Sequence, residues 1–181
     1  MKVTVRDSHI LKTIEPNVLE TYLQTNGWHK TRQFFEGFIW YKKNDTGQAG
    51  EVLVSPHKEF VDFAEVMCDN LKALEVVEKR SQLEIVSELI TFLPNAAISG
   101  WINKVDWEKG ATVQITLIGF VVGKLRKINL ELPEADYQLA LKAYEARSPV
   151  TCFGDLIKEN DGFVLNNPRD FALLTEAELI S

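Results

Sequence analysis

The sequence predicts an α+β fold made of two domains, residues 1–95 and 96–181. In the first domain, apolar residues recur over several stretches at the spacing of an amphipathic helix. In the second domain, segments of alternating apolar and polar residues dominate, which is typical of strands with one buried face. The two patterns meet at Leu93-Pro94-Asn95, a combination that favours a connecting segment. A chain of 181 residues is long enough for two small domains.

The first domain is expected to begin with a helix over residues 15–24, followed by three strands. Pro16 suits the first turn of this helix, and Gly27 can adopt the left-handed conformation that ends it. Aromatic and β-branched residues then lie on both sides of Glu36-Gly37, which indicates a tight hairpin. A second turn at residues 44–47 leads into a third strand over residues 51–55.

Two further helices complete the first domain. Helical spacing of apolar residues resumes at Glu59 and continues to about Lys79. Ser81 and Glu84 have the spacing of a capping box, in which each residue satisfies a backbone N–H group of the other, so a last helix is expected from Ser81 to about Leu93. The predicted N-terminal order is therefore helix, three strands, helix, helix.

The second domain is expected to contain three strands, a helix and two more strands. The strands are predicted at residues 99–105, 112–117, 127–132, 150–156 and 162–165, and the helix at residues 134–147. Residues 171–174 are expected to add a closing edge strand. Alternation places one set of apolar residues inside: Val113, Ile115, Leu117, Ile128, Leu130 and Leu132. The polar residues between them are expected to face outward: Thr112, Gln114, Thr116, Lys127, Asn129 and Glu131.

Composition and charge narrow the class of protein. No apolar run approaches the roughly 18 residues of a membrane span, and residues 1–7 lack the apolar stretch of a signal peptide. Cys68 and Cys152 lie far apart in apolar surroundings, as expected of reduced thiols, so we expect a cytoplasmic protein with no membrane partner. Residues 1–95 carry 11 basic and 14 acidic groups, and residues 96–181 carry 9 and 12. Because each domain has a net negative charge, binding to the phosphate backbone of a nucleic acid is disfavoured.

The order of elements in the second domain resembles an OB-fold, a small Greek-key barrel with a helix between its third and fourth strands. The resemblance covers residues 97 to about 174 and rests on that order and on glycines near strand bends. These glycines are Gly100, Gly119, Gly123 and Gly154. An SH3-like or other small barrel would give a similar order.

The first domain, over residues 15–79, resembles the α-β-β-β-α layout of double-stranded-RNA-binding domains and of the HicA-type ribonuclease toxins. The matching segments are residues 23–28, Gly37 in the hairpin, and residues 52–57 before the next helix. The toxins carry a catalytic histidine two residues after the hairpin glycine, where this chain has Ile39, so the resemblance implies no ribonuclease activity here. Acidic residues also replace the basic helix start that grips RNA: Glu59, Asp62 and Glu65. With these two resemblances taken together, the chain resembles a bacterial protein.

Motifs for catalysis or for a bound cofactor are missing. His9, His29 and His57 have no second histidine or cysteine at metal-ligand spacing, and no phosphate-binding loop occurs, so we expect no metal and no cofactor. His57, after Pro56, is a weak site candidate as a general base or ligand contact; the alternative is a junction residue that caps the following helix. We therefore expect a non-enzymatic protein. An enzyme that uses His57 and the nearby acidic residues stays open as an alternative.

Nucleic-acid binding through the barrel mouth is an alternative function. In OB-folds that bind single strands, aromatic side chains stack on bases and basic side chains follow the phosphates. Trp101, Lys124, Arg126 and Lys127 are the candidate contacts. None of the residues expected to face outward from the second and third strands is aromatic.

Protein–protein contact is the preferred function. Both faces of the predicted N-terminal sheet carry apolar or aromatic residues, and apolar surface left uncovered typically marks an interface. Phe35, Trp40 and Tyr41 are the interface candidates. The covering partner would be another protein, a second copy of this chain, or the barrel domain. We therefore expect a binding or adaptor protein.

Overall fold

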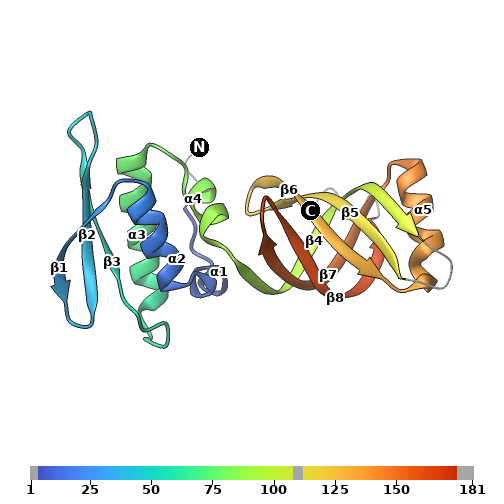
Figure 1. The fold of residues 1–181 in the computed structure, drawn as a ribbon, viewed down its shortest axis with the longest axis horizontal. Coiled ribbons are helices and arrows are strands. Elements are labelled where there is room, and N and C mark those ends of the chain that lie inside the picture. The colour runs from blue at the N-terminus through green and yellow to red at the C-terminus, as the bar shows by residue number, and fades with distance from the viewer. Residues whose placement is uncertain (1–3, 108–111, 175–181) are drawn as a thin grey trace. The chain divides into compact units, whose positions relative to one another are not determined.

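The computed structural model describes residues 4–107 and 112–174. The chain divides into two compact units, Met1–Thr91 and Phe92–Ser181. The N-terminal unit holds a three-stranded sheet with helices, and the C-terminal unit a five-stranded sheet with a helix, which confirms the predicted α+β class (Figure 1).

The N-terminal unit has the predicted helix, three strands and two helices, with one more helix in front of them. Its elements are α1 (Ser8–Thr13), α2 (Pro16–Thr25), β1 (His29–Phe34), β2 (Gly37–Lys43), β3 (Ala49–Val54), α3 (Phe63–Glu78) and α4 (Gln82–Leu89). The Asp7 carboxylate starts α1 by accepting hydrogen bonds from the backbone N–H groups of His9 and Ile10. The six residues of α1 span fewer than two turns, which is too short for helical periodicity to appear in the sequence.

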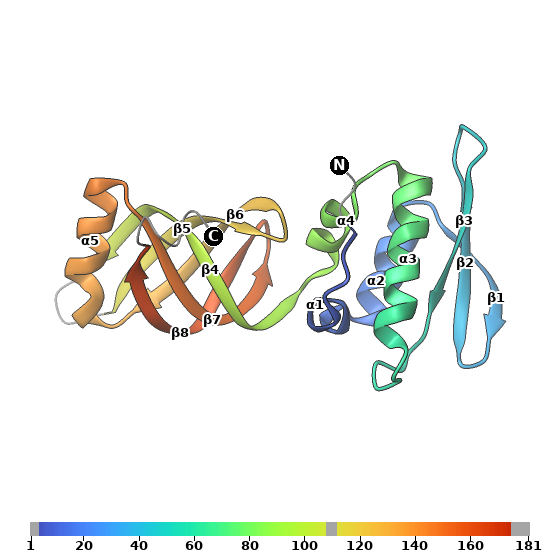
Figure 2. The ribbon, with the colours of Figure 1, turned by 180° about the vertical axis from the view of Figure 1, so that it is seen from behind.

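The N-terminal unit is built in layers (Figures 1 and 2). The antiparallel sheet has the order β1-β2-β3, and α2 and α3 cover one of its faces. Helices α1 and α4 lie on the other side of α2 and α3. The core between the sheet and the helices is made of apolar side chains that are almost fully buried: Leu19, Leu23, Trp40, Val52, Val54, Phe63, Met67, Leu71 and Leu74.

The first hairpin turns one residue earlier than the sequence predicts. Phe34 pairs with Gly37, so Phe35 and Glu36 form the two-residue turn and Gly37 is the first residue of β2. A β-carbon on Gly37 would lie 2.5 Å from the carbonyl oxygen of Val54. Close approach to β3 therefore explains this glycine, and Phe35 takes the left-handed backbone conformation at the turn, with φ of 50°.

The last two helices of this unit differ from the prediction at their ends. Helix α3 begins at Phe63 rather than at Glu59, because residues 60–63 form a turn closed by a hydrogen bond from the Phe63 N–H to the Phe60 carbonyl. The capping box of Ser81 and Glu84 is confirmed at the start of α4. Helix α4 ends at Leu89, before the residue predicted.

The C-terminal unit is a closed five-stranded barrel with one helix. Its elements are β4 (Phe92–Trp107), β5 (Val113–Val121), β6 (Lys124–Leu132), a 3-10 turn η1 (Glu134–Asp136), α5 (Tyr137–Ala146), β7 (Pro149–Glu159) and β8 (Gly162–Leu173). The strand order is β4-β5-β6-β8-β7, and β7 pairs with β4 to close the barrel. All neighbouring strands are antiparallel except β6 and β8, which are parallel. The tail predicted as a separate edge strand continues β8.

The barrel confirms the alternation in the sequence of β5 and β6. The residues predicted to point inward, at positions 113, 115 and 117 of β5 and 128, 130 and 132 of β6, are all buried. The segment Leu93-Pro94-Asn95, predicted as a connection, lies in β4. The register between β4 and β7 shifts between Leu93 and Ala96, and such an irregularity lets a strand contain a proline, which has no N–H to donate.

Gly100 and Gly119 face each other where β4 and β5 pair. A β-carbon on Gly100 would lie 2.3 Å from the carbonyl oxygen of Ile118, and one on Gly119 would lie 2.7 Å from that of Ser99. The two backbones approach closely here because neither residue has a side chain, as is common where strands of a small barrel bend.

Candidate ligand-binding site

A cavity of about 430 Å³ opens at one end of the N-terminal unit. The β1–β2 turn, the last residues of β3 and the start of α3 lie together at this end (Figure 1). The wall is mostly apolar and includes Leu19, Phe34, Leu53, Val54, Phe63, Val66 and Met67. The volume falls in the range of about 300–1,000 Å³ that is typical of ligand pockets.

Helix α3 fixes the wall of the cavity through Asn70. The buried Asn70 side chain accepts a hydrogen bond from the Leu53 N–H at 2.9 Å and donates one to the Leu53 carbonyl at 2.7 Å. Leu53 lies in β3, an edge strand of the sheet, so the amide takes the place of a neighbouring strand. This pair holds β3 against α3 and leaves the cavity beside it.

The rim of the cavity carries exposed apolar side chains. Phe35 is 86% exposed at the hairpin turn and packs edge-on against Phe34, with 4.8 Å between ring centres. Phe60 is 50% exposed, and its neighbour Val61 is 97% exposed. The sequence predicts Phe60 inside a helix, but α3 begins three residues later and Phe60 lies in the preceding loop. Apolar surface therefore continues from the cavity onto the loop and the hairpin.

His57 lines the cavity and lies between two carboxylates. Its Nδ1 lies 2.7 Å from Glu59 Oε1, its Nε2 bonds the Glu36 carboxylate, and its ring lies 5.0 Å from that of Phe60. The hydrogen bonds to Glu59 and then to Glu36 raise the pKa of His57. The pKa of Glu59 is lowered, first by a hydrogen bond with its own backbone and then by His57.

This arrangement makes His57 a link between two loops. A neutral imidazole has one N–H, so donating to carboxylates on both sides requires the imidazolium. Across residues 4–107 and 112–174, no group of three or more histidine, cysteine, aspartate or glutamate side chains is placed to hold a metal ion.

Of the predicted interface residues, Phe35 and Tyr41 are exposed, whereas Trp40 is only 6% exposed. Trp40 lies opposite Val52 on the face covered by α2 and α3, so it offers no surface to a partner. On the other face, Arg32 and Glu51 reach across β2 to form an ion pair at 3.3 Å. The apolar surface predicted for the sheet therefore lies at the hairpin end instead.

The predicted nucleic-acid contacts divide between two sides of the barrel wall. Trp101 pairs with Ile118, and Ile118 pairs with Lys127, so these three form a row across β4, β5 and β6. Lys124 and Arg126 alternate with exposed residues of β6 and are half-buried. Phe120 and Leu125 are paired and exposed, and they extend the row toward the β5–β6 turn. The outer face of β5 therefore carries an aromatic residue, Phe120, which the sequence did not predict there.

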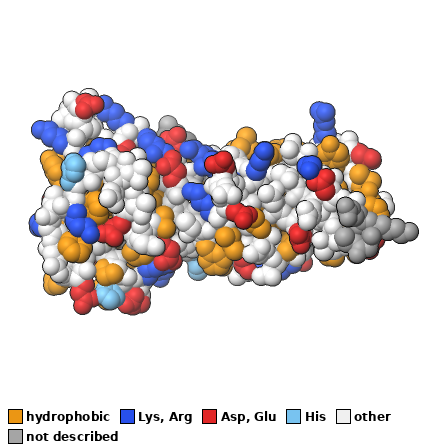
Figure 3. All heavy atoms as spheres, in the orientation of Figure 1, with side chains coloured by type: hydrophobic (Ala, Val, Ile, Leu, Met, Phe, Trp, Pro, Cys, Tyr) orange, Lys and Arg blue, Asp and Glu red, His pale blue; other side chains and the backbone are white. Residues whose placement is uncertain are grey.

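Acidic residues accompany the outer face of the barrel. A groove of about 900 Å³ along β5, β6 and β8 is lined by Asp106, Glu131 and Glu159, with Lys104 as its basic residue. Lys104 is paired with Asp106 at 2.5 Å. On the side of the barrel unit seen in Figure 3, basic and acidic side chains are mixed. Carboxylates repel phosphates, so this groove is poorly suited to a nucleic-acid backbone.

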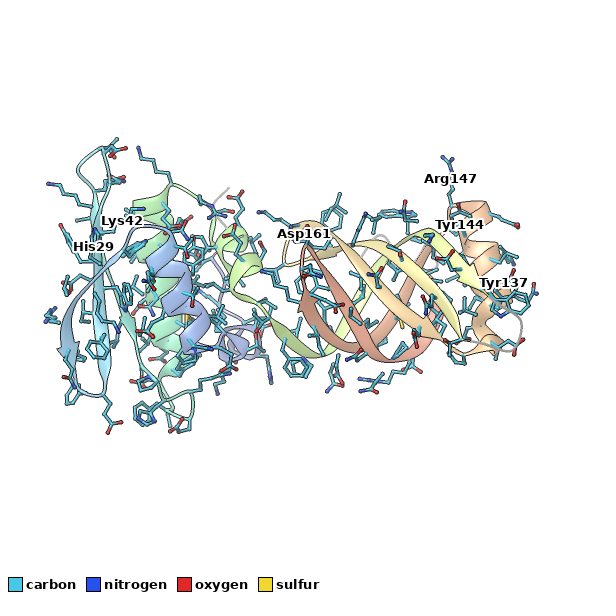
Figure 4. The ribbon with its side chains drawn as sticks, in the orientation of Figure 1. His29, Lys42, Tyr137, Tyr144, Arg147 and Asp161 are labelled. Carbon is cyan, nitrogen blue, oxygen red and sulfur yellow. The ribbon has the colours of Figure 1, made fainter. Side chains whose placement is uncertain are left out.

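Helix α5 covers Trp107, the second tryptophan of the barrel unit. The ring of Tyr137 on α5 stacks on Trp107, with 4.3 Å between ring centres and 20° between planes. Figure 4 shows Tyr137 and Tyr144 on this helix. Trp107 is therefore engaged within the unit, and Trp101 is the tryptophan of this unit that is open to a ligand.

Comparisons with known protein families, with curated proteins and with solved structures give no significant match to this chain. Within the described residues, no helix is both long and apolar enough to cross a membrane.

Proposed function

We propose that this chain is a non-enzymatic binding protein whose N-terminal unit holds an apolar segment of a protein partner in the cavity beside the β1–β2 turn. A closed cavity of this size would suit a small molecule alone. Here exposed apolar side chains continue beyond the cavity, at Phe35, Phe60 and Val61. A polypeptide segment that inserts one side chain and lies across the rim would bury both surfaces.

The observation that most favours this function is that Phe35, which lines the cavity, combines a positive φ with an almost fully exposed aromatic ring. A bulky residue with positive φ costs about 1–3 kcal/mol in backbone strain, and asparagine or glycine would relieve part of it. The exposed ring gains little from packing within the chain to offset that cost. Strain of this kind is typical of binding sites, where the partner supplies the missing contacts.

Display of short random peptides against the purified protein tests the proposal. We expect enrichment of peptides with an aromatic or long aliphatic residue, and loss of that enrichment in Val66→Phe, which fills the cavity from α3. Tyr144→Ala is the matched control, since Tyr144 is an exposed aromatic on α5. Light scattering on the same sample would reveal a second copy of the 20.6 kDa chain as the partner. Absence of enriched peptides together with a monomer would overturn the proposal.

The C-terminal unit supports a second candidate function, single-stranded nucleic-acid binding on an OB-like barrel. Its strand order and the parallel pairing of the third and fifth strands support an OB-like assignment. The observation in favour of nucleic acid is the row of Trp101, Ile118 and Lys127. Fluorescence anisotropy of labelled oligonucleotides across a salt series tests it. Salt-dependent binding that falls in Lys127→Glu would support it, and no binding at low salt would exclude it.

The N-terminal order α2-β1-β2-β3-α3 supports a likeness to double-stranded-RNA-binding domains. The acidic loop before α3 counts against RNA as its ligand, because Glu59 and Asp62 stand where a basic helix start would be needed. Double-stranded oligonucleotides belong in the same anisotropy series, where we expect no binding that depends on this loop.

A further inference from the structure

We infer that the segment bound by the N-terminal cavity carries a lysine or arginine next to its apolar anchor residue. This inference rests on the proposed function and specifies the chemistry of the partner. It comes from the charges around the mouth of the cavity, which the apolar wall alone does not explain.

Carboxylates outnumber basic groups around the mouth. Glu36 on the hairpin and Glu59 in the loop share His57, while Glu15 pairs with Lys58. Asp62 lines the cavity and stands at the N-cap of α3, yet its carboxylate caps no backbone N–H group of that helix. Within the described part of the chain, two carboxylates therefore share one imidazolium, and a third beside them makes no capping bond.

A cationic side chain fits this mouth in position as well as in charge. The same residues that border the apolar wall, Glu36 and Asp62, are acidic, so an ammonium or guanidinium would meet them while its neighbour entered the cavity. The exposed ring of Phe60 adds a face on which an arginine can stack. An acidic segment would meet like charges at the same place and is disfavoured.

The peptide display described above tests the inference when it is repeated with charge variants. Against the wild-type chain, enriched peptides should carry a basic residue beside the apolar one. In the double variant Glu36→Gln and Asp62→Asn, apolar enrichment should remain while the basic preference disappears. Glu145→Gln, a change at an exposed acid of α5, is the matched control and should preserve the preference.

The size of the charge effect is measured by comparing the affinity of one selected peptide with that of the same peptide in which glutamine replaces the basic residue. Exposed ion pairs contribute up to about 1 kcal/mol, so the glutamine form should bind about two- to fivefold more weakly at low salt. This difference should shrink in high salt and in the double variant. Apolar peptides enriched without a basic preference would overturn the inference and leave the proposed function standing. No enrichment of any peptide would overturn both.

Discussion

The side chain of Asn70 binds both backbone groups of Leu53, at 2.9 Å to the N–H and 2.7 Å to the carbonyl. Helix α3 thereby closes part of the free edge of β3. The opposite edge strand, β1, is exposed along its whole length, but it carries Lys30 and Arg32 and an irregular register between them. Charged residues and irregular register discourage the pairing of an edge with another chain. These features favour recognition through the cavity rather than by strand addition.

Replacing Asn70 by alanine should strongly destabilise the N-terminal unit. The change leaves the part-buried N–H and carbonyl of Leu53 without partners, and such a group costs about 1–3 kcal/mol when it is left unpaired. We expect the free energy of unfolding to fall by about 2–4 kcal/mol in chemical denaturation followed by circular dichroism. Asn70→Asp keeps the hydrogen-bond acceptor but loses the donor. It should therefore lower the free energy of unfolding by as much as Asn70→Ala or by somewhat less.

Asp69→Ala is the matched control for this measurement. Asp69 is the preceding residue of α3, is exposed, and forms an ion pair with Lys72 at 2.7 Å. Exposed pairs of this kind contribute little, so the change should stay within about 0.5 kcal/mol. Equal stability losses in both variants would contradict the role given to Asn70.

The buried side chain of Glu78, the last residue of α3, joins that helix to α2 and to Trp28, which lies just before β1. Its carboxylate accepts hydrogen bonds from Tyr22 Oη at 2.5 Å and Trp28 Nε1 at 2.8 Å, with Arg80 at 3.9 Å. Burial and then the bond to Glu78 raise the pKa of Tyr22 far above its ordinary value of 10.0. Glu78→Gln should lower the free energy of unfolding by about 1–3 kcal/mol, since hydrogen bonds to a charged group are lost.

An absorbance titration of the tyrosines checks the same variant independently. In Glu78→Gln the pKa of Tyr22 should move down, because a neutral amide replaces the carboxylate that opposed ionisation. The Tyr22→Phe variant identifies which transition in the titration curve belongs to Tyr22. An unchanged Tyr22 transition in Glu78→Gln would show that burial alone raises this pKa.

Sequence periodicity predicts the fold well where the signal is local. Alternation in β5 and β6 identifies their buried faces, and the Ser81–Glu84 spacing identifies the start of α4. The position of the first hairpin turn depends instead on the contact between Gly37 and Val54, which are far apart in the sequence. Likewise, Pro94 is accommodated in β4 by an irregularity in pairing with a distant strand.

The candidate site is less predictable because its contacts are distant in sequence. His57 stands out at a strand-to-helix junction, but its partner Glu36 lies 21 residues earlier. The exposure of Phe60 and Val61 follows from the later start of α3, which composition does not reveal. Aromatic density around residues 34–41 does predict an apolar surface, although the turn shifted by one residue places Phe35 on it and Trp40 beneath the helices.

The link between the hairpin and the α3 loop should weaken as pH rises. The folded-state pKa of His57 is raised above its ordinary value of 6.5, chiefly by Glu59 and then by Glu36. Its stabilising contribution is therefore complete below pH 6.5 and is lost as pH rises through the folded pKa. Histidine resonances in an NMR titration should place the pKa of His57 above 6.5, and lower in Glu59→Gln.

Chemical denaturation at several pH values gives the matching stability measurement. Stability of the wild-type chain relative to His57→Gln should decline as pH rises through the pKa found by NMR. The control is His9→Gln, a change in α1 away from this mouth. A His57 pKa at or below 6.5 would contradict the double carboxylate bonding.

Phe35→Asn should raise stability while it removes binding. Asparagine tolerates positive φ better than phenylalanine, so we expect the free energy of unfolding to rise by about 0.5–1 kcal/mol. Val122→Asn is the matched control, since Val122 has φ of 47° at the β5–β6 turn. That variant should gain similar stability and still bind the selected peptides. A loss of stability in Phe35→Asn would instead mean that the ring is held for its contact with Phe34, and its conformation would no longer favour a binding site.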